Sequence, residues 1–317
     1  MSPLDERQLA LVGLGQALQA EGYRFVTPTP RTHALVNARP ENLEARSLRD
    51  IFGWSRPFAL AVLPEALRRL GQAAQVLEPA GGDGRWRSSV RFSTLRSFAG
   101  DGHLLFVHSA FPTDAHDSVF FGPDSYRFAA FLGRAIWKAE RLVDVGCGSG
   151  VGGIVLASRA RQVVLADVNP RALAFAQVNC ALAGLEPGAV ELQVSDVLAN
   201  IEGAIDVVIA NPPYLTDAGG RLYRDGGGAL GLELGQRILV EAFDRLSPGG
   251  TLGLYTGSPV VDGRNAIEDW AGPLLRERAR TWTWEELDPD VFGEELAGDA
   301  YRHAERIAVT ALVAEKA

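Results

Sequence analysis

Short apolar runs, each bounded by glycine, proline or asparagine, alternate with helical patterns from residue 141 onward. Runs of this length predict strands buried inside a sheet, and their alternation with helices is typical of parallel α/β folds. The strands are expected at 142–145, 163–166, 190–194, 205–210, 251–256, 282–287 and 307–313. The helices are expected at 151–159, 170–183, 229–246 and 264–278. The pattern therefore predicts one largely parallel α/β sheet.

The first third of the chain has a mixed pattern instead. Leucines at helical spacing, N-terminal prolines and terminal glycines indicate helices, and an alternation of apolar and polar residues indicates a strand. The helices are expected at 3–21, 41–52 and 64–74, with a loop around 28–30 and strands at 85–92 and 104–107. Since 317 residues suggest roughly two domains, we expect a smaller α+β domain over 1–119 and the α/β domain over 120–317.

A glycine-rich turn follows the first strand of the α/β part. Such a turn lets a ligand approach the backbone and the N-terminus of the next helix. Gly148, Gly150 and Gly153 formally match a dinucleotide fingerprint, with Asp167 after the next strand, so a nicotinamide-dependent oxidoreductase is one interpretation. Asp144 at the end of the first strand argues against it, because a carboxylate would repel a pyrophosphate and attract a positively charged sulfur.

The same turn resembles the first motif of the class I S-adenosylmethionine-dependent methyltransferases. The resemblance implies a Rossmann-like sheet of seven strands with the last strand inserted antiparallel, and S-adenosyl-L-methionine as cofactor. In that family the first acid and the glycine loop hold the methionine part, a second acid binds the ribose hydroxyls, and a third lies beside the adenine amino group. The resemblance assigns cofactor binding to Asp144, Gly146, Cys147, Gly148, Gly150, Asp167, Val168, Asp196, Val197 and Asn211.

Two prolines end the apolar run at 205–210, which places Asn211-Pro212-Pro213-Tyr214 at the carboxyl end of a strand. The tetrapeptide resembles the fourth motif of amino-methyltransferases that act on planar nitrogen. The Asn211 side-chain oxygen and the Pro212 carbonyl can accept the two N–H groups of an amide or exocyclic amine. The nitrogen becomes positive as the methyl group arrives, so both acceptors act most strongly in the transition state. Pro213 fixes the loop, and Tyr214 can stack on the flat group.

Among such enzymes the chain resembles the HemK-type glutamine methyltransferases, which modify peptide-release factors. The glycine-rich segment 224–232 is similar to one that follows the tetrapeptide in that family, although Ala229 and Leu230 replace its usual acid–glycine pair. The segment 120–126 is equally similar to the small-domain methyltransferases of ribosomal RNA. The first 119 residues do not match the all-helical substrate domain of the HemK type. On the similarity of segment 224–232, we expect a protein glutamine amide as acceptor. The similarity of segment 120–126 keeps an exocyclic amine of adenine or guanine in RNA or DNA as the alternative.

The charge and the cysteine content of the chain limit which macromolecules and metals it can be expected to bind. The net charge of −8 argues against wholesale wrapping of nucleic acid, although residues 1–135 hold 15 basic and 13 acidic side chains against 16 and 26 in the rest. Cys147 and Cys180 form no disulfide framework or metal-ligand pattern. We expect no signal peptide, because charged residues interrupt the first apolar positions, and no run of about 20 apolar residues is present. We expect a cytoplasmic enzyme without a metal, away from membranes, whose substrate is a release factor, a ribosomal protein or RNA.

Overall fold

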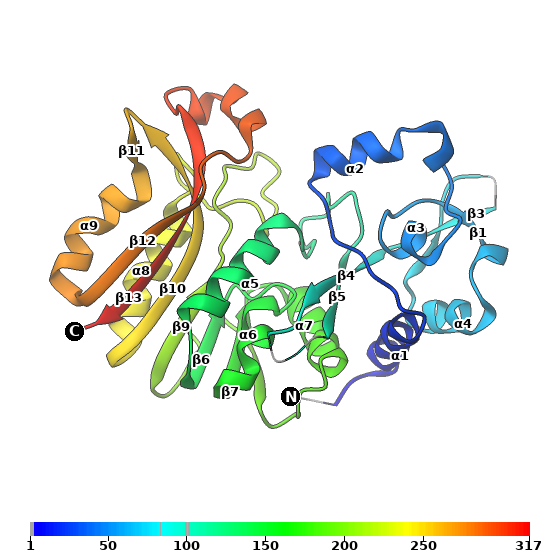
Figure 1. The fold of residues 1–317 in the computed structure, drawn as a ribbon, viewed down its shortest axis with the longest axis horizontal. Helices are drawn as coiled ribbons and strands as arrows, with labels where there is room; N and C mark the ends of the chain where they lie inside the picture. The colour runs from blue at the N-terminus through cyan, green and yellow to red at the C-terminus, as the bar shows by residue number, and fades with distance from the viewer. Residues whose placement is uncertain (1–2, 83, 99, 101) are drawn as a thin grey trace.

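A large, mostly parallel sheet forms the centre of the computed structural model, which describes residues 3–82, 84–98, 100 and 102–317 (Figure 1). Its strands follow the order β12-β13-β10-β9-β6-β7-β8, and the short β11 pairs with the end of β10. Strands β6 to β10 pair in parallel, whereas β13 lies antiparallel between β10 and β12. The expected seven-stranded sheet with an inserted antiparallel last strand is thereby confirmed, with β11 as an addition.

The strands of this sheet are β6 (Ala139–Val145), β7 (Ala160–Asp167), β8 (Val190–Val194), β9 (Ile205–Ala210), β10 (Leu246–Val261), β11 (Arg264–Asn265), β12 (Ala279–Asp288) and β13 (Arg306–Lys316). The helices are α5 (Pro123–Ala135), α6 (Val151–Leu156), α7 (Pro170–Leu182), α8 (Glu233–Arg245) and α9 (Ala266–Arg278), with 3₁₀ turns η3 (Ala157–Arg159), η4 (Gly293–Ala297) and η5 (Asp299–Tyr301). Helices α5, α6 and α7 share one hydrophobic core with the sheet, and α8 and α9 share another. The sheet is thus covered on both faces.

Several boundaries in this half differ from the prediction, most clearly those of β10, which extends five residues beyond the expected strand at each end, and of α8. Helix α8 begins at Glu233, four residues later than expected, and 229–232 belongs to the preceding loop. Gly231 has a φ of 74°, a left-handed conformation that a helix does not accommodate. The glycine-rich segment therefore lies outside the helix and forms part of the loop that precedes it.

The N-terminal region, residues 3–119, forms two small sheets and four helices in its described part. The helices are α1 (Glu6–Ala20), α2 (Pro30–Asn37), α3 (Leu48–Phe52) and α4 (Glu65–Ala73), with 3₁₀ turns η1 (Pro40–Asn42) and η2 (Leu60–Val62). The strands are β1 (Phe58–Ala59), β2 (Leu77–Pro79), β3 (Arg85–Ser88), β4 (Val90–Arg96) and β5 (His103–Ser109). Strands β1, β3 and β2 form one sheet, and β4 and β5 form a separate hairpin.

Two predictions for this region are wrong, and one helix was not predicted. The segment after Pro30 is a helix, because Thr29 caps its N-terminus and Pro30 occupies the first turn, where a proline is tolerated. The helix expected at 41–52 is reduced to its last five residues, 48–52, which Ser47 caps. The strand expected at 85–92 is interrupted at Ser89, whose N–H donates to Val76, so its two halves join different sheets.

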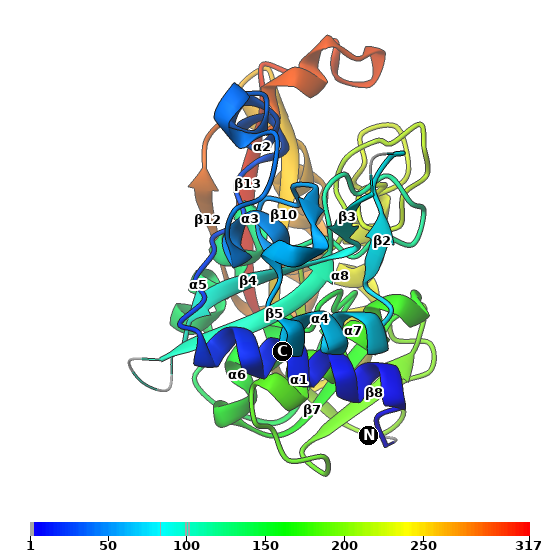
Figure 2. The same cartoon turned by 90° about the vertical axis from the view of Figure 1, so that its right-hand side faces the viewer.

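Helix α7 joins the two halves of the molecule. One face packs on the central sheet, and the other shares a core with α1 and the β4–β5 hairpin, so α1 and α7 lie side by side (Figure 2). Asn179 on α7 is fully buried and bonds both backbone groups of Val107 on β5, at 2.7 and 3.0 Å. Its amide also donates to the carbonyl of Ser149, at 2.9 Å. The Asn179 side chain therefore connects β5 of the N-terminal region to the turn at 146–150.

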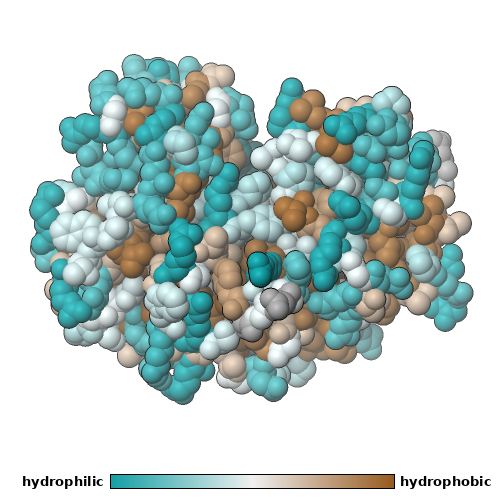
Figure 3. Space-filling view, viewed as in Figure 1, coloured by the Kyte–Doolittle hydropathy of each residue, from teal (hydrophilic) through white to brown (hydrophobic). Residues whose placement is uncertain are grey.

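The surface is mainly polar in the orientation of Figure 1, with scattered apolar patches and a notch between the two upper lobes (Figure 3). Within the described residues, no helix combines the length and apolar character that crossing a bilayer requires.

Candidate active site

A cavity of about 470 Å³ lies at the carboxyl ends of β6, β7, β8 and β9, where open α/β sheets bind their ligands. Its floor is made by the glycine turn and the residues after each strand. Thr29, Pro30 and Arg31 line it from the N-terminal region, and 222–224 lines it from the loop that follows Tyr214. Every predicted site residue lines this cavity except Gly150, which packs against α6, α7 and β7. The segment 120–126, expected along the pocket, also lines it in part.

The glycine turn has a backbone that side chains would strain. Gly146, Gly148 and Gly150 have φ values of 64°, 53° and 80°. A Cβ on Gly150 would lie 3.1–3.2 Å from side-chain carbons of α6, α7 and β7. The Cys147 side chain is buried within the turn, and burial raises the pKa of its thiol well above the ordinary value. This thiol therefore stays protonated and fills space.

Asp144 is almost completely buried beneath the turn. Its carboxylate accepts a hydrogen bond from the Gly153 N–H on α6, at 2.8 Å. Gly152 makes this approach possible, because a Cβ there would lie 2.8 Å from the carboxylate. The sequence pattern did not single out Gly152. Burial raises the pKa of Asp144 to about 7, and a cation in the cavity would stabilise its ionised form.

Asp167 joins the second strand to the turn. One carboxylate oxygen accepts the Gly148 N–H at 2.8 Å, and the other accepts the Asn169 N–H at 2.9 Å. Burial raises its pKa, while these two backbone donors oppose the rise. The side chain is 9% exposed and lines the cavity. A ligand with hydroxyl groups could donate to the remaining acceptor sites of this carboxylate.

The third strand-end acid lies further out. Asp196 lines the cavity rim and pairs with Arg237 on α8, with 2.8 Å between Nη2 and Oδ2. Val197 is buried with a φ of 49°, and Val168 is 47% exposed over the cavity. Asp196 and the two valines thus provide polar and apolar surface in the place expected for a heterocyclic base. The adenine contact of Asp196 and Val197 stays a prediction.

The tetrapeptide 211–214 leaves the end of β9 and enters the same cavity as the glycine turn. Tyr214 is 7% exposed, and its hydroxyl donates to the Asp124 carboxylate at 2.8 Å. Its ring packs against Gly257 and lies edge-on to Phe292, with ring centroids 6.0 Å apart. Stacking of Tyr214 on a substrate stays a prediction, whereas the hydroxyl has a partner that the sequence pattern did not indicate.

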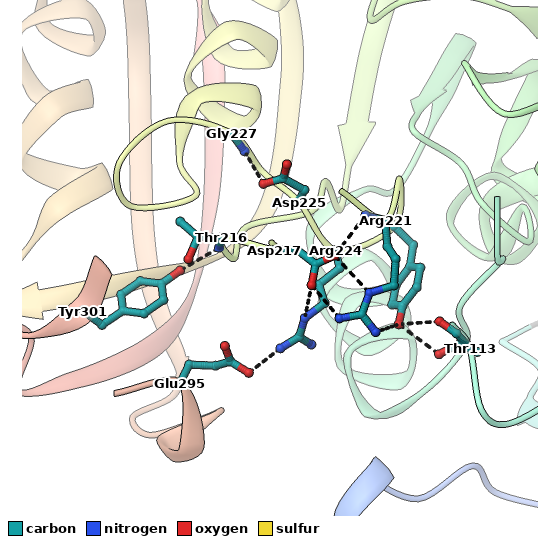
Figure 4. Close-up of polar contacts among 10 residues, drawn as sticks. Thr113, Thr216, Asp217, Arg221, Arg224, Asp225, Gly227, Glu295 and Tyr301 are labelled. Atoms are coloured by element: carbon teal, nitrogen blue, oxygen red, sulfur yellow. Dashed lines mark hydrogen bonds and ion pairs between the residues drawn. The ribbon is translucent and has the colours of Figure 1, made fainter. Parts of the chain in front are cut away.

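A covering loop, defined as residues 215–231, lines the cavity with Leu215 and 222–224. It is held by charge pairs (Figure 4). Asp217 pairs with Arg221 in a bidentate manner, at 2.5 and 3.0 Å, and with Arg224 at 3.4 Å. Arg224 also pairs with Glu295 on η4. The hydrogen bonds from Arg221 lower the pKa of Asp217 to about 2. The loop is therefore tied to itself and to the C-terminal part of the chain.

The same loop is tied to the N-terminal region through Tyr223. Its hydroxyl lies 2.9 Å from Thr113 Oγ1 and donates to the Thr113 carbonyl at 3.2 Å. Its ring stacks on Phe120, with centroids 5.4 Å apart and planes at 11°. Phe120 in turn packs against Gly122, which precedes α5. Tyr223 thus connects the roof of the cavity to its side wall.

Sheet order, glycine turn and strand-end acids together define the fold of a class I methyltransferase. Residues 127–260 match the family model described as Methyltransferase small domain. This match contains the glycine turn, the three strand-end acids and the tetrapeptide at 211–214.

Curated relatives carry similar names. Release factor glutamine methyltransferases of Deinococcus radiodurans and Moorella thermoacetica are 34% and 35% identical over 171 and 183 residues. These alignments cover 50% and 53% of this chain and 56% and 61% of the relatives. Ribosomal RNA small subunit methyltransferase C of Alcanivorax borkumensis is 30% identical over 125 residues, covering 39% of this chain and 34% of the relative. The chain thus spans less than two thirds of each relative.

Among solved structures, a 16S rRNA methyltransferase of T. thermophilus in complex with AdoMet and guanosine superimposes with a TM-score of 0.47 and 19% identity. The superposition covers 83% of this chain and 64% of that one.

Proposed function

We propose that this protein is a cytoplasmic enzyme that transfers a methyl group from S-adenosylmethionine to the planar nitrogen of a protein glutamine side chain. The observation that carries the proposal is the meeting of two motifs in one cavity. The glycine turn with its buried acids and the tetrapeptide at 211–214 line the same space of about 470 Å³. Methyl transfer needs a sulfonium site and a nitrogen site in direct contact, so that the reacting atoms are aligned.

The residues present fit the cofactor. Asp144, Gly146 and Gly148 would hold its methionine part, Asp167 would accept its ribose hydroxyls, and Asp196 with Val197 would border its base. Bound there, S-adenosylmethionine supplies an electrophilic methyl group on a positively charged sulfur. The buried carboxylate of Asp144, with a pKa of about 7, favours a positive neighbour.

The acceptor nitrogen would lie at Asn211 and Pro212. An amide nitrogen is a poor nucleophile, because its lone pair is delocalised into the carbonyl. Two oxygen acceptors that hold its N–H groups favour a tetrahedral nitrogen and stabilise the positive charge that develops there. No general base is needed before transfer, since the surplus proton can leave afterwards.

A protein acceptor is favoured over a nucleic acid by the charges around the cavity. Its lining contains seven acidic side chains and three arginines. This charge balance disfavours the approach of a polyanion and tolerates a neutral amide. The similarity to relatives named release factor glutamine methyltransferase agrees with that choice. A release factor is therefore the proposed substrate.

An exocyclic amine of ribosomal RNA is the second candidate. The relatives named ribosomal RNA small subunit methyltransferase C favour it, and so does the excess of arginines over acids in residues 1–135. The chemistry at Asn211 and Pro212 would be the same, because both acceptors carry N–H groups on a flat system.

Purified protein incubated with methyl-labelled S-adenosylmethionine separates the candidates when a bacterial release factor and ribosomal RNA are offered in parallel. We expect label in the release factor, and none with Asn211→Ala. Label in RNA alone would replace the first candidate by the second. No transfer to either, together with calorimetric binding of NAD(H) and none of S-adenosylhomocysteine, would overturn the methyltransferase proposal.

A further inference from the structure

Asp124 lies at the side of the cavity, where four elements of the chain meet. It is in the first turn of α5 and is 8% exposed. The hydroxyl of Tyr214 donates to Oδ2 and that of Tyr255 on β10 donates to Oδ1, each at 2.8 Å. Arg127 pairs with Oδ1 at 3.3 Å and with Asp288, at the end of β12, at 2.6 Å. One carboxylate therefore joins α5, the acceptor motif, β10 and β12.

Tyr214 has little freedom around this contact. A Cβ at Gly257 would lie 2.2 Å from Cδ2 of the ring, so the ring fills the space that the glycine leaves. Phe292 contacts the ring edge-on, with ring centroids 6.0 Å apart. Burial raises the pKa of the Tyr214 hydroxyl well above its ordinary value, so this hydroxyl remains a donor at neutral pH. The Tyr214 ring therefore packs against Gly257, and its hydroxyl is held by Asp124.

Tyr214 is also the last residue of the tetrapeptide that carries the proposed nitrogen acceptors. Two rigid prolines separate its ring from Asn211, so a fixed ring restricts the backbone path of the motif. A shift of about 1 Å in a reacting group can cost on the order of 100-fold in rate. The position of Tyr214 therefore governs where the Asn211 amide and the Pro212 carbonyl point.

We infer that Asp124 is a positioning residue, which sets the acceptor oxygens of Asn211 and Pro212 by holding the hydroxyl of Tyr214. This inference rests on the proposed methyl transfer at that motif. Asp124 acts through Tyr214 and takes no part in the transfer itself. Arg127 balances its charge, so that the carboxylate stays available to both phenols.

Tyrosine-to-phenylalanine variants test the inference, because they remove one oxygen and keep the ring. Tyr255→Phe is the matched control for Tyr214→Phe, since both hydroxyls bond the same carboxylate at the same distance and only Tyr214 belongs to the motif. We expect Tyr214→Phe to lower kcat about 10- to 100-fold with acceptor KM unchanged. Tyr255→Phe is expected to stay within about threefold of wild type, because Tyr214 and Arg127 still hold Asp124.

Asp124→Asn should lower kcat like Tyr214→Phe, and the double variant Asp124→Asn/Tyr214→Phe should be no worse than the slower single variant. Binding of S-adenosylhomocysteine should stay unchanged in each variant. Losses that multiply in the double variant, weakened binding of S-adenosylhomocysteine, or equal effects of Tyr214→Phe and Tyr255→Phe would overturn the inference.

A spectroscopic measurement tests the same point without turnover. The chain has six tyrosines, so ring-labelled tyrosine gives few NMR signals, which single phenylalanine variants assign. Asp124→Asn should shift the signals of Tyr214 and Tyr255 and leave Tyr23 unmoved, because the hydroxyl of Tyr23 bonds a backbone carbonyl elsewhere. An unmoved Tyr214 signal would overturn the inference alone, whereas wild-type protein without transferase activity would overturn the proposed function alone.

Discussion

The floor and the roof of the cavity are held by different kinds of contact. In the floor, the buried acids Asp144 and Asp167 accept hydrogen bonds from backbone N–H groups of the glycine turn and the following helices. In the roof, the covering loop is held by ion pairs between side chains, such as the buried Asp217 carboxylate with the partly exposed Arg221. Backbone donors on packed elements cannot move without leaving a buried carboxylate unpaired, which is costly. Ion pairs near the surface contribute little and exchange readily with water.

This contrast assigns different tasks to the two walls. In the proposed function, the floor would fix the reacting groups, so changes there should act on turnover and on stability at neutral pH. The roof would control access, so changes there should act on substrate affinity and on exposure of the loop. Four substitutions test this division, and their expected effects decrease in the order given.

Asn211→Ala removes the side-chain acceptor from the floor. We expect turnover to fall by a factor on the order of 100 to 1,000, the usual cost of losing one donor or acceptor at a developing charge. Calorimetry with S-adenosylhomocysteine should give an affinity within a few-fold of wild type, since the glycine turn is intact. Undiminished turnover would contradict the proposed role of the tetrapeptide.

Asp144→Asn tests the buried charge of the floor. The folded-state pKa of Asp144, about 7, lies above its ordinary value of 3.8, so the folded protein binds the proton more tightly than the unfolded chain. The carboxylate therefore costs stability progressively as the pH rises from about 4 to 7. Chemical unfolding should show that the stability of the variant relative to wild type rises by on the order of 4 kcal/mol between pH 4 and pH 8. A difference in stability that stays the same at both pH values would refute the raised pKa.

Tyr223→Phe loosens the roof by removing the hydroxyl contacts with Thr113, while the ring can still stack on Phe120. We expect acceptor KM to rise by about 2- to 5-fold, which corresponds to one lost hydrogen bond of about 0.5–1 kcal/mol, with kcat unchanged. Tyr23→Phe, far from the cavity, serves as the control. A fall in kcat with constant KM would show that Tyr223 positions the reacting groups, as proposed for the floor, and does not control access.

Asp217→Asn should have the smallest effect. The pKa of Asp217 is lowered from 3.8 to about 2, so its ion pairs stabilise the loop above about pH 4, and this contribution is lost as the pH falls toward 2. The loss of stability at pH 7 should stay below about 1 kcal/mol because solvent screens the pair. Trypsin cleavage after Arg221 or Arg224 should become faster in the variant. Equal cleavage rates in variant and wild type would show that these ion pairs do not hold the loop.

The sequence pattern located the floor better than the roof, for a physical reason. Strands β8 and β9 have the predicted bounds, since each ends where polar or proline residues follow the strand pattern, Ser195-Asp196 after β8 and Asn211-Pro212 after β9. The site residues after these strands follow from the topology alone, because the carboxyl ends of parallel strands lie along one edge. The glycine turn and the tetrapeptide therefore met in one cavity as expected.

Contacts between distant segments were beyond the reach of the pattern. Asp124 lies 90 residues from Tyr214 and 131 from Tyr255, and no local spacing relates the three. The N-terminal region depends on such contacts throughout, since its elements are short and acquire their conformation from caps and from packing on α7. Pro30, for example, fits a loop boundary and the first turn of a helix equally well, and only Thr29 capping decides between them.

Mapping of the methylated atom tests the central claim most directly. A release factor is incubated with this protein and isotopically labelled S-adenosylmethionine, digested, and sequenced by tandem mass spectrometry, with Asn211→Ala in parallel. We expect one labelled methyl group on the side-chain nitrogen of a glutamine, absent from the reaction with the variant. A methyl group on any oxygen, carbon or sulfur, or equal labelling by the variant, would contradict it.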